Sequence, residues 1–173
     1  MSKEKKSNAN SRRAFMKAGA TTAAGFMIVP RHVLGKGFIP PSDKLNLASI
    51  GAGGKGWSDI NNAFNKGANN VVALCDVDFE RAGRAVEKFG KAKQYKDFRK
   101  MIDEMGKDID AITISGPDHM HAVAAMAAIQ EGKHVYVQKP LTHNIYEARM
   151  LTQAARKYKS VTQMGNQGAY NPG

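Results

Sequence analysis

A lysine directly follows an apolar stretch that is suited to a buried strand. Residues 134–138, HVYVQ, are followed by Lys139 and Pro140. If this stretch is a central strand, Lys139 emerges at its carboxyl end, where it can donate a hydrogen bond to a substrate hydroxyl or carbonyl and assist proton transfer. The structural alternative is a solvated lysine before a turn-forming proline. Both interpretations stay open, and the first makes Lys139 a catalytic residue.

A glycine-rich turn follows the apolar run at residues 45–50. In GAGGKG, the residues Gly51, Gly53 and Gly56 fit the pattern G-x-G-x-x-G, with Gly54 inside the same turn. The first glycine permits a tight turn, the second lets the backbone approach a pyrophosphate, and the third lets helix and strand pack closely. Flexible loops also produce this pattern by chance, so its position after a strand and before a helix is what predicts a cofactor-binding turn.

An acidic residue lies at a distance from this turn that suits a dinucleotide. Asp76 follows the run VVALC and lies twenty residues beyond Gly56. Its carboxylate can accept hydrogen bonds from the adenosine ribose, and its charge would repel a 2′-phosphate. The alternative is that Asp76 or Asp78 caps the next helix, for which Asp78 is better placed. The pattern predicts a site for NAD rather than NADP.

The stretch SGPDHMH, residues 115–121, forms a further turn at the end of a strand. Pro117 suits the first turn of a helix, and Asp118 suits the positive end of the helix dipole. His119 and His121 are two residues apart and do not share a helical face, so a two-histidine metal site is not expected. For His119, a structural role and a place near a cofactor are both open. Cys75 is the single cysteine and is expected to be a buried strand residue.

Short apolar runs alternate with segments of helical spacing from Leu45 onward. Strands are expected at residues 45–50, 71–75, 109–115, 134–138 and 160–164, with a weaker one near Gln94 and Tyr95, and helices at residues 54–66, 78–90, 97–105, 118–131 and 143–158. This alternation predicts a doubly wound α/β domain with a parallel sheet covered by helices on both faces. Ligands of such domains bind beyond the carboxyl ends of the strands, where the four turns lie.

The first 30 residues have the order of an export signal: a charged region, a modest apolar region and a return to polarity. Arg12 and Arg13, followed by Phe15 and Lys17, resemble the bacterial twin-arginine signal. The alternative is a basic tail with a chance arginine pair. The signal predicts a partner in the twin-arginine export machinery and a periplasmic or exported protein.

The remaining boundaries follow from composition. Residues 31–44 contain two glycines and the pair Pro40 and Pro41 without a sustained period, and they are expected to be a linker. Residues 45–165 are expected to form the dinucleotide-binding domain, and residues 166–173 the start of a truncated second domain.

The formal net charge of +11 is unevenly distributed. Residues 1–44 contain nine Lys and Arg against two acidic residues, whereas the remainder contains seventeen against thirteen. The folded part is therefore only mildly basic, and it shows no basic stripe with interleaved aromatic residues. We do not expect nucleic-acid binding.

Together, these turns resemble the N-terminal half of the Gfo/Idh/MocA oxidoreductase family over about residues 45–170. The resemblance rests on IGAGGKG, ALCDVDFERA, the stretch from ISGPDHMH to VQKPLTHN, and TQMGNQG. It implies that the glycine turn holds the NAD(P) pyrophosphate and that Asp76 meets the ribose. It also implies that Pro117 and His121 belong to a turn near the cofactor, and that Lys139 and Pro140 form the family's E-K-P motif, which contacts nicotinamide and substrate.

The sequence departs from the family pattern at two places. The glutamate of E-K-P is Gln138 here, which keeps the size and hydrogen bonding of the residue but loses a carboxylate that could tune the pKa of the lysine. In addition, the chain ends at Gly173, where the family's substrate domain would begin. We expect that this domain is absent, that the chain alone is inactive, and that the full-length form is a homo-oligomer.

The resemblance implies an exported oxidoreductase that transfers a hydride between nicotinamide and a sugar, a polyol or a sugar derivative. A second hypothesis is a glycosidase or sugar lyase that oxidises its substrate transiently and recycles NAD within each turnover. A third is a nucleotide-binding module without catalysis, because a fold does not guarantee an activity.

Overall fold

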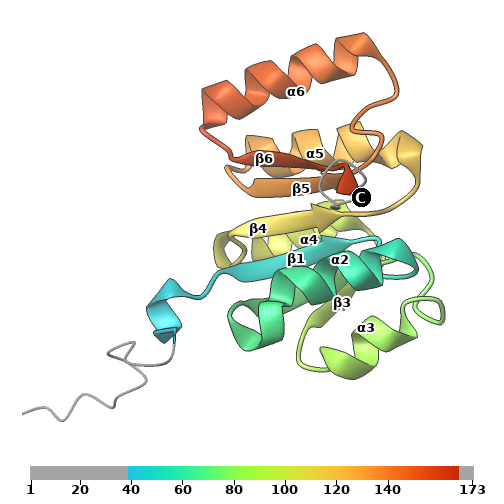
Figure 1. The fold of residues 1–173 in the computed structure, drawn as a ribbon, viewed down its shortest axis with the longest axis vertical. Coiled ribbons are helices and arrows are strands. Elements are labelled where there is room, and N and C mark those ends of the chain that lie inside the picture. The colour runs from blue at the N-terminus through green and yellow to red at the C-terminus, as the bar shows by residue number, and fades with distance from the viewer. Residues whose placement is uncertain (1–38, 168–173) are drawn as a thin grey trace, which may run out of the picture. The chain divides into compact units, whose positions relative to one another are not determined.

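The computed structural model describes residues 39–167, so the predicted export signal and residues 168–173 lie outside the described part. Six parallel strands form one sheet in the order β3-β2-β1-β4-β5-β6 (Figure 1). The strands are β1 (Asn46–Ile50), β2 (Asn70–Cys75), β3 (Lys93–Tyr95), β4 (Ala111–Ile114), β5 (His134–Gln138) and β6 (Thr162–Gly165). The predicted doubly wound α/β fold is therefore confirmed, including the weak strand near Tyr95.

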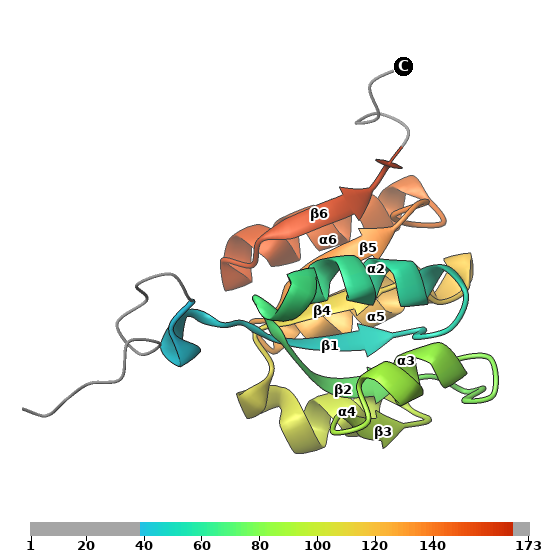
Figure 2. The same ribbon diagram turned by 60° about the horizontal axis from the view of Figure 1, so that its bottom comes forward.

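Helices cover both faces of this sheet (Figure 2). The helices are α2 (Lys55–Phe64), α3 (Gly83–Lys88), α4 (Phe98–Met105), α5 (His121–Gln130) and α6 (Ile145–Tyr158), and short 3-10 turns lie at Pro41–Asp43, Asn65–Gly67, Gly106–Asp108 and Asp118–Met120. Helices α2 and α3 pack on one face, and α4, α5 and α6 on the other. Within the described residues, none of these helices has the length and apolar character that crossing a bilayer requires.

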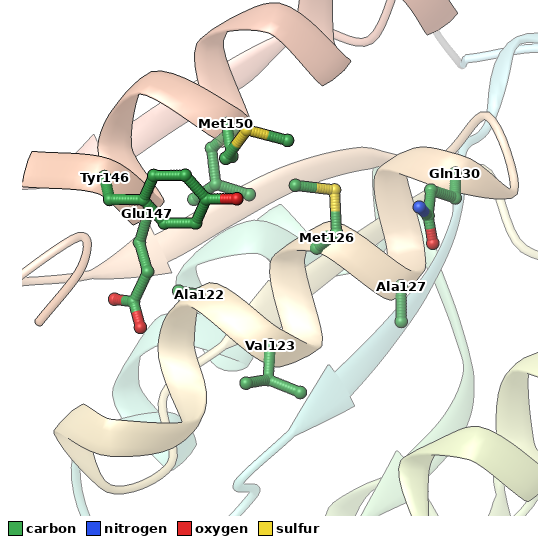
Figure 3. A pocket seen from close by; sticks show the side chains of 9 residues that line it. Ala122, Val123, Met126, Ala127, Gln130, Tyr146, Glu147 and Met150 are labelled. Carbon is green, nitrogen blue, oxygen red and sulfur yellow. The ribbon is translucent and has the colours of Figure 1, made fainter. Parts of the chain in front are cut away.

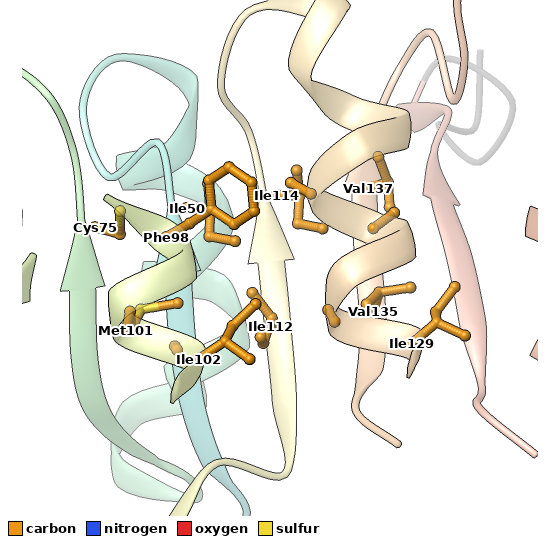
Figure 4. Packing of buried hydrophobic residues seen from close by; sticks show 14 of the residues in the cluster. Ile50, Cys75, Phe98, Met101, Ile102, Ile112, Ile114, Ile129, Val135 and Val137 are labelled. Carbon is orange, nitrogen blue, oxygen red and sulfur yellow. The ribbon is translucent and has the colours of Figure 1, made fainter. Parts of the chain in front are cut away.

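The larger apolar core lies beneath α4, α5 and α6 (Figure 4). Strands β4 and β5 are buried on this face through Ile112, Ile114 and Val137, which have at most 1% of their surface exposed. Helix α5 meets them with small, fully buried residues such as Ala124 and Ala128, which allow the helix to lie close to the strands. This explains why the stretch 134–138 is apolar.

The core on the opposite face is smaller and contains the aromatic residues of α2 and its neighbours. The ring of Phe89 packs against Phe64 at 5.2 Å and against Trp57 at 6.3 Å between centroids. The Lys88 ammonium lies over the same rings. Trp57 is thus a packing residue that fixes α2 against the segment around α3.

The register brings the ends of the central strands to one level. Ile50 of β1 lies opposite Cys75 of β2 and Ile114 of β4, and Ile114 lies opposite Val137 of β5. The turns that follow these strands therefore meet at one edge of the sheet, as expected for a ligand site of this fold.

Helix α3 shows the largest difference from its predicted start. We expected a helix over residues 78–90, but α3 begins only at Gly83. The Asp78 carboxylate accepts hydrogen bonds from the backbone N–H groups of Glu80 and Arg81, both at 3.1 Å, and closes a separate turn. The Ala82 N–H donates to the Asp78 carbonyl oxygen at 3.1 Å, whereas the Gly83 N–H donates to the Glu80 carbonyl oxygen at 3.2 Å, a tighter i to i−3 bond. Asp78 therefore caps one separate turn before α3 begins.

The core predicts a large effect of truncation in the central strand β4. We expect Ile112→Ala to lower the free energy of unfolding by about 3 kcal/mol, because it leaves a cavity in a closely packed region. The matched control is Ile145→Ala at the start of α6, where the side chain is 71% exposed, and it should change stability by less than about 0.5 kcal/mol. Urea unfolding of both variants measures this. Equal effects would contradict the described core.

Candidate functional site

The turns after β1, β2 and β4 enclose a cavity of about 480 Å³ at the carboxyl edge of the sheet. Its wall combines backbone of the glycine turn with charged side chains. The lining residues are Gly51, Gly53, Lys55, Asp76, Val77, Asp78, Arg81, Ser115, Gly116 and Pro117. The cavity thus brings together four of the predicted cofactor-binding residues from three separate turns.

Two glycines of the turn are required by close backbone contacts. A Cβ atom at Gly56 would lie 1.7 Å from the carbonyl oxygen of Gly51, and one at Gly51 would lie 2.5 Å from the backbone nitrogen of Gly116. Gly51 also has a φ of +78°, a conformation that favours glycine. Helix α2 can therefore begin directly against the end of β1, and its first residue, Lys55, lines the cavity.

The other two glycines lie beneath an arginine that was not singled out from the sequence. A Cβ atom at Gly53 would lie 3.1 Å from Cγ of Arg81, and one at Gly54 would lie 3.3 Å from the Arg81 guanidinium. Arg81 is exposed and lines the cavity together with Lys55. Two cations thus border the turn, which suits an anionic ligand such as a pyrophosphate. In the sequence, the available signal for Arg81 was its position five residues after Asp76.

Asp76 lies half-buried at the end of β2, where the sequence placed it. One carboxylate oxygen accepts a hydrogen bond from the Gly53 N–H at 2.9 Å, and the other accepts from the Asp78 N–H at 3.0 Å. Each oxygen retains a further lone pair for a ligand hydroxyl. Asp78 caps the following turn, as expected, and both aspartates line the cavity. The role of Asp76 as a ribose ligand stays a prediction.

The third turn has one residue at the cavity and one beneath it. Pro117 lines the cavity, whereas His121 is only 1% exposed. The His121 ring nitrogens lie 2.6 Å from the Pro140 carbonyl oxygen and 2.9 Å from the Gly116 carbonyl oxygen. Both partners are acceptors, and a neutral ring can donate to only one of them. His121 thus lies between the cavity turn and the Lys139–Pro140 turn, and its neutral ring can donate a hydrogen bond to one of the two.

Lys139 and Pro140 are exposed at the end of β5 and do not belong to the lining of the cavity. They lie at the same edge of the sheet, joined by a cis peptide bond. The Lys139 N–H donates to Oε1 of Gln138 at 3.3 Å. Within residues 39–167, the Lys139 ammonium has no hydrogen-bond or ion-pair partner, so it is available to a ligand.

A buried carboxylate behind the glycine turn was also missed from the sequence. Asp59 of α2 forms an ion pair with Lys55, a residue of that turn, and its carboxylate contacts Ser115 and Gln138. In the sequence, the signal for Asp59 was a polar residue on the side of the predicted helix that faces the sheet.

Within residues 39–167, no cluster of three or more His, Cys, Asp and Glu side chains is placed to hold a metal ion. His119 is exposed.

A second hollow, of about 470 Å³, lies between α5 and α6 (Figure 3). Its walls are mainly apolar, with Met126, Tyr146 and Met150 prominent. Glu147 also lines this hollow. Its carboxylate accepts a hydrogen bond from the His143 N–H just before α6. This hollow presents few groups for chemistry, and we assign the functional site to the carboxyl edge of the sheet instead.

The geometry defines the class of protein. A glycine turn, an acidic residue after the second strand and two cations surround one cavity at the end of a Rossmann sheet, which is the arrangement of a dinucleotide-binding domain. The chain belongs to the Gfo/Idh/MocA family: the model described as "Oxidoreductase family, NAD-binding Rossmann fold" matches residues 45–166. The predicted family is therefore confirmed.

The relatives of this chain have two kinds of activity in their names. Inositol 2-dehydrogenase of Salmonella typhimurium is 32% identical over 105 residues, which cover 60% of this chain and 31% of the relative. Alpha-N-acetylgalactosaminidase of Shewanella oneidensis is 27% identical over 181 residues, which cover 90% of this chain and 39% of the relative. The chain thus spans between about a third and two fifths of these relatives' length.

A solved structure agrees with this assignment. The crystal structure of an NAD-binding oxidoreductase from Klebsiella pneumoniae superimposes with a TM-score of 0.64 at 32% sequence identity. The match covers 75% of this chain and 36% of that protein. The similarity concerns the Rossmann domain, which is the part that the two chains share.

Cys75 provides a test of the packing beside the site. Burial raises the pKa of its thiol to about 12, and the carboxylates of Asp76 and Asp97 add to the shift. The thiol therefore stays protonated at pH 8, and we expect it to react with a disulfide reagent at least about a hundredfold more slowly in the folded protein than in the urea-unfolded chain. Because Cys75 is the single cysteine, absorbance reports it alone. Similar rates would contradict the described burial.

The contact between Gly56 and Gly51 makes a second prediction. We expect Gly56→Ala to lower the free energy of unfolding by about 2 kcal/mol or more, because the added methyl group must displace the backbone of the turn. Gly83→Ala is the matched control, since a Cβ atom there meets nothing within 4 Å at the first position of α3. It should be neutral or stabilising by up to about 1 kcal/mol. Thermal unfolding compares the two, and a tolerated Gly56→Ala would contradict the geometry.

Proposed function

We propose that this chain is the NAD-binding part of an oxidoreductase that transfers a hydride between nicotinamide and a sugar, a polyol or a sugar derivative. NAD is the cofactor of the family's Rossmann domain, and when bound it supplies the hydride acceptor or donor. The observation that carries the proposal is the cavity itself, because the groups around it fit the parts of a dinucleotide.

The residues fit NAD at two places. The glycine turn and the start of α2 would hold the pyrophosphate, with Lys55 and Arg81 adding positive charge. The Asp76 carboxylate would accept hydrogen bonds from the adenosine ribose hydroxyls, and its negative charge disfavours a 2′-phosphate. This supports NAD over NADP as the preferred cofactor.

Lys139 is the residue that we assign to the reaction. Its ammonium is exposed at the end of β5, on the edge of the sheet that carries the cavity. There it would hold the oxygen of the substrate carbinol or carbonyl and exchange a proton with it as the hydride moves. Because this chain spans between about a third and two fifths of its relatives' length, we place the other contacts to the substrate outside it.

The second candidate function is a glycosidase or sugar lyase that oxidises a hydroxyl transiently and cleaves the glycosidic bond by elimination. The match to an alpha-N-acetylgalactosaminidase over 90% of this chain favours it. The same Rossmann domain would serve both reactions, because each needs nicotinamide. Net release of NADH with a free sugar would indicate a dehydrogenase, and cleavage of a glycoside without net NADH would indicate the second function.

We further propose that the protein is exported by the twin-arginine route. The proposal rests on Arg12 and Arg13 and on the apolar run that follows them, all of which lie outside the described residues. This route carries folded proteins, which suits an enzyme that must bind its cofactor before export. Replacing both arginines with lysine should retain the protein in the cytoplasm of the producing bacterium, and unchanged export would contradict this proposal.

NADH binding to the 173-residue chain tests the cofactor site. We expect nucleotide fluorescence to saturate with the unmodified chain. Asp76→Asn should weaken NADH binding by about tenfold, because the ribose hydroxyls lose a charged acceptor, and it should reduce the preference for NADH over NADPH. Asp103→Asn, at an exposed position on α4, is the control and should bind as the unmodified chain does. Absence of NADH binding by the folded chain would refute the proposed function.

A further inference from the structure

A single buried carboxylate connects three elements behind the cavity. Asp59 on α2 has a side chain that is 3% exposed. One of its oxygens forms an ion pair with the Lys55 ammonium, and the other accepts hydrogen bonds from the Ser115 hydroxyl at 2.7 Å and from the Gln138 amide at 2.9 Å. Asp59 therefore holds the glycine turn, the end of β4 and the end of β5 at the same time.

Both ends of the Gln138 amide have a defined partner. Its Nε2 donates to Asp59, and its Oε1 accepts from the Lys139 N–H. A carboxylate can only accept and a backbone N–H can only donate, so these partners fix the orientation of the amide. Gln138 thus connects the Asp59 carboxylate to the backbone of Lys139.

The strand next to Gln138 leaves space for this arrangement. Gly165 of β6 lies opposite Gln138, and a Cβ atom there would come within 2.9 Å of the Gln138 Nε2 and 2.6 Å of the Tyr136 hydroxyl. The Gln138 amide is therefore enclosed between β6 and α2. It has little room to move away from Asp59, although its two ends can exchange places.

A glutamate at position 138 would conflict with Asp59. It would bring two carboxylates to hydrogen-bond distance in a buried place, where like charges oppose ionisation of both groups. The glutamine avoids this repulsion and supplies the donor that Asp59 needs. The departure from the E-K-P pattern is thus matched to a carboxylate on α2.

We propose that Asp59 is the positioning residue of this site: it supplies from α2 the carboxylate that the E-K-P pattern carries on the strand, and through Gln138 it orients Lys139. The inference deepens the proposed function, because it concerns the residue to which we assign the reaction. Asp59 also fixes Lys55, which lines the cavity. One carboxylate therefore sets both a cation beside the cofactor turn and the residue at the end of β5.

The variant Asp59→Asn tests the orientation of the chain at Lys139. Asparagine offers one oxygen and one NH₂ group, and the Lys55 ammonium can only donate, so the oxygen faces Lys55 and the NH₂ group faces Ser115 and Gln138. The Gln138 amide then turns over, and the Lys139 N–H loses its acceptor. We expect hydrogen exchange of the Lys139 N–H to accelerate by about fivefold, with a change in its chemical shift, measured by NMR on the full chain labelled with ¹⁵N-lysine.

A double variant that swaps the carboxylate and the amide between Asp59 of α2 and Gln138 of β5 is the sharper test. Gln138→Glu alone should lower the Tm by about 5 °C, because it faces Asp59 with a second carboxylate. Adding Asp59→Asn should recover most of this loss, since the new amide on the helix can donate to the new carboxylate on the strand. That carboxylate can in turn accept from the Lys139 N–H, whose exchange should then return to within about twofold of the original rate.

Two conservative changes at exposed positions serve as controls. Asp103→Asn on α4 and Gln94→Glu on β3 make the same chemical changes away from the network and should alter neither the Tm nor the Lys139 N–H exchange. An unchanged Lys139 N–H in folded Asp59→Asn, or a double variant that is no more stable than Gln138→Glu, would overturn the proposal. All of these measurements are made without nucleotide, so their outcome is separate from that of the NADH titration.

Discussion

The site depends on how closely helix α2 approaches the end of β1. At Gly56, even a methyl group would overlap the carbonyl oxygen of Gly51, and Gly51 in turn lies against the backbone of Gly116. Three backbone segments thus meet without side chains between them. Because of this contact, the start of α2 faces the cavity, and the next turn of the helix places Asp59 against the ends of β4 and β5.

The residues of the site lie at two levels, one that borders the cavity and one that is buried behind it. The upper level, with Asp76, Lys55 and Arg81, borders the cavity and would meet a ligand. The lower level, with Asp59 and His121, is buried and bonds to the backbone or side chains of the turns above. The cost of burying such polar groups is offset only when each finds partners. Their bonds therefore indicate which turns must keep a fixed geometry.

The fold, the glycine turn and Asp76 could be predicted from the sequence because their signals are local, whereas the two cations of the upper level, Lys55 and Arg81, were not singled out. Strands and helices alternate, and the glycine turn and Asp76 stand immediately after strands. The lower level depends on contacts between distant residues: Asp59 and Gln138 are 79 positions apart. The late start of α3 was missed for a different reason, since the separate turn capped by Asp78 and the tighter bond from Gly83 to Glu80 do not show in the helical spacing of the sequence. The sequence shows at Gln138 only the loss of a charge, whereas the structure shows that its amide bonds to the Asp59 carboxylate on α2.

The central claim is that the turns after β1, β2 and β4 form one nucleotide site. Adding NAD⁺ to the ¹⁵N-labelled chain and recording which backbone amides shift tests it most directly. We expect the largest shifts at Gly53, Gly54 and Asp76, with little change at Met126 and Tyr146 in the hollow between α5 and α6. Shifts concentrated at that hollow, or no shifts at saturating nucleotide, would contradict it.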